Sequence, residues 1–179
     1  MVALPSLRVV PARVEDAEAL IDLRQSVLVE GCWFATRPDE HPVSIEHSQA
    51  VVSGLLAQPN GTMLVAWLEG ELVGLIAVHG ERLARMRHVG RMEMMVDKSV
   101  RGQGVGTALL VACLRWAAAA PLLRKLSLAV FADNQVAIDL YRRHGFVHEG
   151  RREGEYMLED GTARADLLMA RDVGVRNRS

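Results

Sequence analysis

Apolar side chains recur along the chain with two different periods, and these periods divide it into helices and strands. Between residues 15 and 29, apolar residues spaced three and four positions apart predict an amphipathic helix. Ser44 can cap a second helix that ends near residue 57, before a Pro-Asn-Gly turn. Further helices are predicted at 105–120 and 134–143, and we expect Asp133 to cap the latter. Alternating or continuous apolar segments predict strands at residues 7–10, 62–68, 71–79, 88–96, 126–130, 146–158 and 162–170.

The order of these elements, β-α-α-β-β-β-α-β-α-β-β, indicates an α/β fold. With 179 residues, of which 50% are hydrophobic, the chain is long enough for one well-buried core. Two domains of half this length would each have a poor core. We therefore expect a single domain over residues 1–179, in which residues 172–179 form a flexible tail.

Charge and cysteine content narrow the classes of function. The chain has 21 basic and 22 acidic residues, so its net charge of −1 attracts neither nucleic acid nor an anionic membrane. Two cysteines, one of them within an apolar helix, indicate a reduced, cytoplasmic protein. Residues 1–6 lack a signal-peptide pattern and no apolar stretch reaches about 18 residues, so neither secretion nor a membrane span is expected. The histidines have no metal-ligand spacing, and no metal is expected.

Residues 101–107, Arg-Gly-Gln-Gly-Val-Gly-Thr, lie between a predicted strand and a predicted helix. Glycines at alternate positions allow backbone N–H groups to converge, and the start of the helix adds a partial positive charge. This segment therefore predicts a site for a pyrophosphate. Its spacing fits neither the triphosphate loop, which requires a lysine after the glycines, nor the dinucleotide loop Gly-x-Gly-x-x-Gly. The alternative is a glycine-rich connection that binds no ligand.

Arg101, Gly104 and Gly106 form the pattern Arg-x-x-Gly-x-Gly, which resembles the coenzyme A loop of the GNAT superfamily of acyl-CoA-dependent N-acetyltransferases. A second segment matches that family as well: Asn134-x-x-Ala137-x-x-x-Tyr141, followed by Gly145-Phe146. Together with the order of elements, the resemblance covers residues 7–171. It implies a single GNAT-like α+β domain in which helices flank a central mixed, mostly antiparallel sheet.

The resemblance also implies acetyl-CoA as the cofactor and indicates which residues bind it. In this family the strand before the loop separates from its neighbour, and the pantetheine arm pairs with its backbone. Here these positions are Met94, Met95 and Val96. The asparagine of the second segment, Asn134, would also contact the cofactor. Backbone N–H groups that would hold the pyrophosphate come from Arg101, Gly102, Gln103, Gly104, Val105, Gly106 and Thr107.

Two residues are candidates for catalysis. By resemblance, the Tyr141 hydroxyl lies near the cofactor sulfur as general acid, two helical turns beyond Asn134; the alternative is a core-facing aromatic. Glu93 is a candidate general base, because burial in an apolar strand could raise its pKa. The alternative for Glu93 is an open strand face or a pair with Arg91. N-terminal acetyltransferases of this family often place a glutamate where this chain has Ala129, which counts against a ribosomal-protein substrate.

The acceptor amine would meet the first two helices and the late hairpin, where acidic and aromatic residues suit a cationic amine. Candidate lining residues are Glu30, Trp33, Phe34, Glu155 and Tyr156. Exposed aromatic residues could instead form dimer contacts. The nearly all-apolar helix at 105–120 also leaves a homodimer open.

Taken together, these observations favour acetyl-CoA-dependent acetylation of a primary amine, on a small molecule or an amino acid, by direct attack in a ternary complex. Two alternatives remain open at this point. The acceptor could be the amine of a protein or peptide. The chain could also be a non-catalytic acyl-CoA-binding regulatory module.

Overall fold

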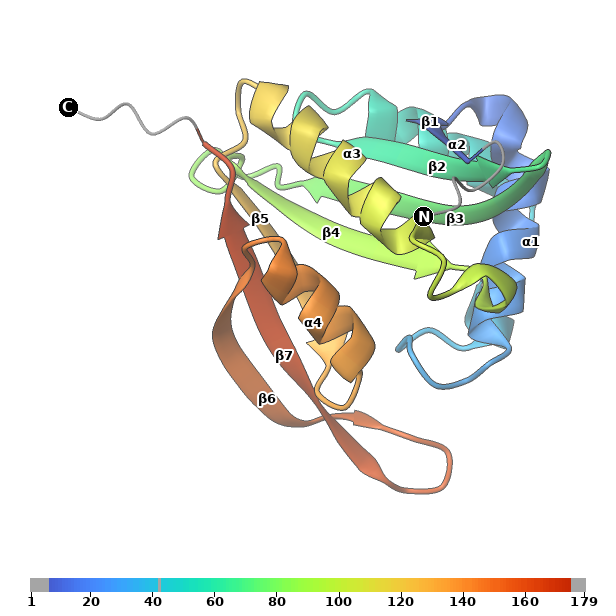
Figure 1. Ribbon diagram of the computed structural model, residues 1–179, viewed down its shortest axis with the longest axis vertical. Coiled ribbons are helices and arrows are strands. Elements are labelled where there is room, and N and C mark those ends of the chain that lie inside the picture. The colour runs from blue at the N-terminus through green and yellow to red at the C-terminus, as the bar shows by residue number, and fades with distance from the viewer. Residues whose placement is uncertain (1–6, 42, 175–179) are drawn as a thin grey trace.

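The computed structural model describes residues 7–41 and 43–174, which form one seven-stranded sheet with α-helices on both faces (Figure 1). The α-helices are α1 (Ala17–Leu28), α2 (Ile45–Leu56), α3 (Val105–Ala119) and α4 (Gln135–Arg143). The strands are β1 (Arg8–Pro11), β2 (Thr62–Leu68), β3 (Glu71–Gly80), β4 (Val89–Val96), β5 (Lys125–Phe131), β6 (Val147–Met157) and β7 (Ala163–Asp172). Every predicted helix and strand within the described residues is present.

The strands are arranged in the order β1-β2-β3-β4-β5-β7-β6, and every neighbouring pair is antiparallel except β4 and β5. This confirms the mixed, mostly antiparallel sheet. The parallel pair is short, because it joins only Val89–Arg91 of β4 to Lys125–Ser127 of β5. Beyond Arg91 the two strands separate, and β5 continues instead along β7 as far as Phe131. The sheet is therefore split open along half the length of β4.

Each face of the sheet has its own apolar core, because successive side chains of a strand point to opposite faces. One core lies under α3 and α4, and its fully buried members include Leu109, Leu110 and Cys113. The other core lies under α1 and α2, and it includes Leu20 and Leu75. The helices pack against the intact part of the sheet and leave the opening between β4 and β5 accessible.

α3 and α4 both begin at the opening, and the residue before each helix favours a helix start at that position. α3 starts at Gly104, whose φ of 91° is a left-handed conformation that favours glycine. It ends just before Pro121, which cannot continue a helix. The cap of α4 was predicted wrongly: Asn134 caps it by accepting from the Ala137 N–H at 3.2 Å, whereas the Asp133 carboxylate binds Arg164.

The last hairpin forms as predicted, and β7 is longer than expected because it extends to Asp172. The next two residues, Val173 and Gly174, donate their N–H groups to the Arg124 carbonyl at 2.9 and 3.3 Å. The first three residues of the expected tail are therefore held against the sheet. The remainder of that tail (175–179), and the N-terminal segment 1–6 considered for a signal peptide, lie outside the described residues.

We expect truncation of the core under α3 to lower stability strongly. Leu109 has no exposed surface, so Leu109→Ala should reduce the free energy of unfolding by about 2–5 kcal/mol. Urea denaturation followed by circular dichroism measures this change. Val136→Ala is the control, since Val136 is 82% exposed and its truncation should change the free energy by less than about 0.5 kcal/mol. Equal effects of the two substitutions would contradict the assignment of the core.

Candidate active site

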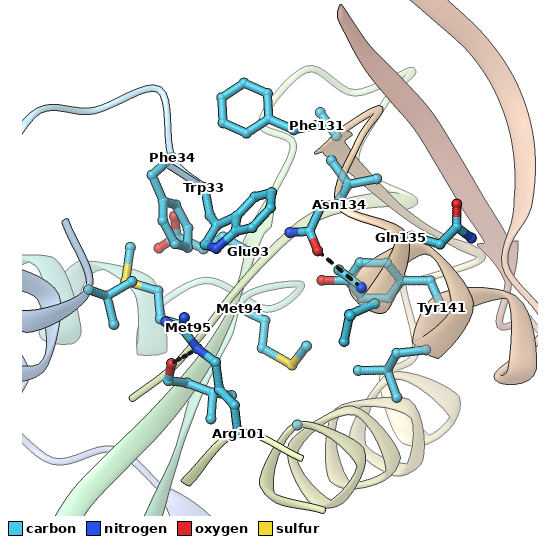
Figure 2. A pocket seen from close by; sticks show the side chains of 18 of the residues that line it. Trp33, Phe34, Glu93, Met94, Met95, Arg101, Phe131, Asn134, Gln135 and Tyr141 are labelled. Atoms are coloured by element: carbon cyan, nitrogen blue, oxygen red, sulfur yellow. Dashed lines mark hydrogen bonds between the residues drawn. The ribbon is translucent and has the colours of Figure 1, made fainter. Parts of the chain in front are cut away.

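The separation of β4 from β5 opens a cavity of about 1090 Å³. One side is formed by β4 and the glycine-rich loop, and the other by β5 and α4. The loop after α1 contributes Trp33 and Phe34 (Figure 2). One continuous cavity thus contacts both segments that the sequence analysis selected, although residues 108–133 separate them in the chain.

The glycine-rich loop directs unpaired backbone N–H groups toward this cavity. Gly102 and Gly104 have φ values of 77° and 91°, which turn successive amides in a common direction. Within the described residues, the N–H groups of Gly102, Gly104, Val105, Gly106 and Thr107 have no acceptor. The first residue whose N–H group makes a helical hydrogen bond in α3 is Ala108, which donates to the Gly104 carbonyl. These amides, together with the N-terminal end of the α3 dipole, fit an anionic group such as a pyrophosphate.

Two of the seven predicted amides are already used. The N–H groups of Arg101 and Gln103 donate to Lys98 and Val100, both at 3.4 Å, and close the turn before α3. The Arg101 side chain is also committed. Its Nε donates to the Val96 carbonyl at 2.9 Å, and its two terminal nitrogens bind both carboxylate oxygens of Glu30, at 2.7 and 2.5 Å. Glu30 was predicted to line the acceptor site, but it instead braces the glycine-rich loop against the end of α1.

The free edge of β4 offers backbone groups to the cavity. The Asp97 N–H donates to the Val73 carbonyl of β3 at 2.9 Å. In an antiparallel pair every second residue is hydrogen-bonded to its partner, so Met95, two positions before Asp97, is also bonded to β3. The alternation then directs the N–H and C=O groups of Met95 toward β3, and those of Met94 and Val96 toward the opening. Met95 contributes to the lining through its side chain only. Of the three predicted pantetheine contacts, Met94 and Val96 therefore have the suitable backbone orientation.

Tyr141 belongs to the core and to the cavity at once. Its ring packs on Phe146 with centroids 5.6 Å apart, and the residue is 6% exposed. Its hydroxyl points into the cavity, beside Asn134 (Figure 2). Burial raises the pKa of the Tyr141 phenol, and the nearby Cys113 thiol adds to this effect. The proton therefore stays on the oxygen at neutral pH.

Glu93 also lines the cavity, but its environment differs from the predicted one. Burial raises the pKa of the carboxyl, but the neighbouring His79 and Arg24 outweigh this effect and hold the pKa at about 2. Arg24 donates to Oε1 of Glu93 at 2.8 Å, and His79 Nε2 lies 3.8 Å from the same oxygen. The prediction of a raised pKa is wrong, because Arg24 and His79 lower the pKa more than burial raises it. The spacing of residues along the sequence could not show that Arg24, on α1, lies beside Glu93. The suggested pair with Arg91 is wrong as well, since Arg91 binds Glu81.

The end of the cavity beyond Tyr141 is largely aromatic. Trp33, Phe34 and Tyr156 line it as predicted, together with Phe131, which the sequence analysis missed. Glu155 is not among the lining residues, and it pairs with Arg152. Phe131 had no recognisable signal, because a buried aromatic at the end of a strand is most often a core residue.

Asp166 is a second lining residue that the sequence analysis missed. It is 1% exposed, binds Arg152, and accepts from the Tyr156 hydroxyl at 3.3 Å. Within residues 7–41 and 43–174, no three histidine, cysteine or acidic side chains gather as metal ligands would. In the same residues, every helix is too short or too polar to span a membrane.

The low pKa of Glu93 leads to a stability prediction. Folding lowers this pKa from 4.5 to about 2, so the carboxylate stabilises the fold above pH 4.5, and this contribution is lost as the pH falls toward 2. We expect Glu93→Gln to lower the free energy of unfolding at pH 7. The substitution should also flatten the dependence on pH between 4.5 and 2. Urea titrations at a series of pH values measure both effects. Glu159→Gln is the control because Glu159 is 80% exposed, and identical curves for both variants would refute the pairing.

Comparisons with known proteins agree with this geometry. Residues 26–146 match the Acetyltransferase (GNAT) family. The L-amino acid N-acetyltransferase AaaT of Escherichia coli (strain K12) is 30% identical over 109 residues, which are 58% of this chain and 67% of that protein. An acetyltransferase of the GNAT family from Streptococcus pneumoniae superposes with a TM-score of 0.90 at 29% identity, covering 93% of this chain and 99% of that one.

A more distant structure has the same fold. The Salmonella typhimurium protein yncA, solved with its cofactor acetyl-CoA, has a TM-score of 0.85 at 14% identity. The likeness covers 97% of this chain and 96% of that one. The match to the family extends from α1 to the residue after Gly145, so it includes the glycine-rich loop, Glu93 and Tyr141. The chain belongs to the GNAT family of N-acetyltransferases, enzymes that use acetyl-CoA as acyl donor.

Proposed function

We propose that this enzyme transfers the acetyl group of acetyl-CoA to the primary amine of a small molecule, in particular an amino acid, by direct attack in a ternary complex. One observation carries the proposal. A single cavity joins the free amides of residues 102–107 to the aromatic end around Glu93, and the Tyr141 hydroxyl lies between them. The similarity to an L-amino acid N-acetyltransferase supports this class of acceptor.

The residues on the donor side would bind coenzyme A mostly through backbone groups. The five free amides from Gly102 to Thr107 would bind the pyrophosphate, and the space beside Gly102 and Gly104 is open. The backbone of Met94 and Val96 would pair with the amide groups of the pantetheine arm, as an added strand pairs with an open sheet edge. The Asn134 amide nitrogen is not needed for the α4 cap and can donate to the same arm. These contacts direct the thiol end toward Tyr141.

The thioester supplies an activated acetyl group, and the protein has to orient the amine and manage charge. Tyr141 keeps its proton at neutral pH and donates it to the sulfur as negative charge builds there. Glu93 is ionised and lines the cavity, but Arg24 balances its charge, so it would contact the attacking amine as a hydrogen-bond acceptor and not as an unpaired charge. With a pKa near 2, Glu93 does not retain a proton, so the ammonium group loses its first proton to water before it attacks. The nitrogen loses a second proton to water as the amide forms, and water returns a proton to the Tyr141 oxygen.

The aromatic lining of the acceptor end favours a small acceptor over a protein. The loop after α1 covers it with Trp33 and Phe34, while Phe131 and Tyr156 line the other side. An extended peptide would need an open channel across these side chains. The non-catalytic alternative has lost its basis, because the family is one of enzymes and Tyr141 presents its hydroxyl to the cavity.

A screen of acceptors tests the proposal. The purified protein is incubated with acetyl-CoA and each of the twenty L-amino acids, small amines and an N-terminal peptide, and the released thiol is measured. We expect release with at least one free amino acid and none with the peptide. Product mass should increase by one acetyl group. Release that depends only on the peptide would contradict a small-molecule acceptor.

A side chain at Gly106 should block the cofactor site without unfolding the protein. A Cβ atom there would lie 3.4–3.8 Å from Leu140, Met94 and Val96, so a longer side chain would extend into the cleft. We expect Gly106→Leu to weaken coenzyme A binding at least about 100-fold, measured by isothermal titration calorimetry. Stability should not fall, because leucine has a higher helix propensity than glycine. Gly54→Leu on the exposed side of α2 is the control. Unchanged affinity of Gly106→Leu for coenzyme A would refute the proposed pyrophosphate site in the glycine-rich loop.

Removal of the Tyr141 hydroxyl should affect turnover and spare binding. We expect Tyr141→Phe to lower kcat by about 10² to 10⁴-fold, the range for loss of a general acid. The dissociation constant of coenzyme A should stay within about twofold of that of the native enzyme, since the ring still packs on Phe146. Unaltered turnover would remove the acid role from Tyr141.

A further inference from the structure

Arg164 on β7 joins three parts of the chain that are distant in sequence. One terminal nitrogen donates to the Cys32 carbonyl at 2.6 Å, and the other binds both oxygens of Asp133 at 2.5 and 2.6 Å. The guanidinium group lies 4.2 Å from the centroid of Phe131 and 5.6 Å from that of Trp33. Its side chain is only 12% exposed. Such a planar, multiply bonded group resists replacement even by lysine.

The segment that Arg164 holds is the loop after α1. It extends from α1 toward the start of α4 (Figure 1), and a short 3-10 helix occurs within it at Pro38–Glu40. The contact at Cys32 fixes the loop one residue before Trp33. Trp33, Phe34 and Phe131 then line the same end of the cavity (Figure 2). Arg164 itself is not among the residues that line the cavity, so it acts from behind this aromatic wall.

The acidic groups of the cavity are already neutralised. Three acids line it within the described residues, and each is paired with an arginine that reaches it from outside. These pairs are Glu93 with Arg24, Asp133 with Arg164, and Asp166 with Arg152. An acceptor with a second ammonium group would find no unpaired carboxylate, and would lose hydration without compensation. An apolar body would instead pack against aromatic rings.

We propose that Arg164 is a positioning residue for acetyl transfer: it holds Trp33 and Phe34 over the acceptor end of the cavity, which thereby selects primary amines with an apolar body. This inference rests on the proposed function, because it names the class of acceptor for the same site. The expectation from the sequence, that acidic residues of the site attract a cationic amine, is revised. The acidic residues of the site do not serve a polycationic amine, because each is neutralised by an arginine.

Kinetics on matched acceptors test the proposal. The probes are 2-phenylethylamine and L-phenylalanine as apolar acceptors, and putrescine and L-lysine as acceptors with a second ammonium group. We expect the native enzyme to prefer the apolar member of whichever pair it acetylates, by about tenfold or more in kcat/KM. Arg164→Met should raise KM for that acceptor about tenfold or more, because the wall is no longer held in place. The affinity for coenzyme A should be unchanged, since Arg164 touches no donor-side residue.

Two further variants separate positioning from a general loss of structure. Arg164→Lys keeps the charge near Asp133 but cannot also reach Cys32, so we expect an intermediate KM in a fully folded protein. This variant carries the test if Arg164→Met does not fold. Arg151→Met is the matched control, because Arg151 lies on the neighbouring β6, is 50% exposed and pairs only with Glu153. It should leave KM and selectivity unchanged.

Fluorescence reports on the wall directly. With Trp67 and Trp116 replaced by Phe, the emission of Trp33 should shift to longer wavelength in Arg164→Met and stay unchanged in Arg151→Met. An unshifted emission, an unchanged KM, or a native preference for the doubly charged probes would each overturn the inference while transfer itself persists. Failure of the native enzyme to acetylate any amine would instead overturn the proposed function.

Discussion

The arrangement of the site depends on the loss of pairing between β4 and β5 after Arg91. A strand inside a sheet normally satisfies its backbone groups on both sides. Here β5 beyond Ser127 pairs only with β7, on its other edge, and β4 is left with an open edge at Met94 and Val96. One of the exposed groups, the Val96 carbonyl, is satisfied internally by Arg101. The others remain free, and under the proposed function they would pair with the extended pantetheine arm of the cofactor.

Arginine–carboxylate pairs hold the opening in shape. Arg101 and Glu30 join the glycine-rich loop to the end of α1, and Arg24 and Glu93 join α1 to β4. Pairs of this kind on the surface contribute little to stability, but these lie where two elements have no sheet hydrogen bonds between them. The Arg101–Glu30 pair is bidentate, and this geometry fixes orientation more than it adds free energy. They also neutralise the acids of the site, so that the interior of the cavity presents aromatic surface and ordered polar groups.

Under the proposed function, the two ends of the cavity would use different physical means of recognition. The donor end would rely on backbone N–H groups, which are fixed by the turn at Gly102 and Gly104 and do not depend on side-chain identity. The acceptor end relies on side chains, most of them from the loop after α1, the end of β5 and the late hairpin. Tyr141 sits where the two ends meet, on a helix that is anchored by Phe146 and capped by Asn134. With this division the acceptor site can change while the donor site is kept, because the loop after α1 can vary without disturbing the glycine-rich loop.

The sequence by itself determined the order of helices and strands, the position of the glycine-rich loop between β4 and α3, and the position of Tyr141 on α4. Hydrophobic period, glycine spacing and helix punctuation are local properties, and local geometry carries them directly into the fold. Only the tertiary structure decided which charges meet. Arg24 lowers the pKa of Glu93 although 69 residues separate them, and Arg164 reaches Cys32 across 132 residues. Such pairs depend on how the sheet splits and where the loop after α1 returns, and no spacing along the chain encodes either distance.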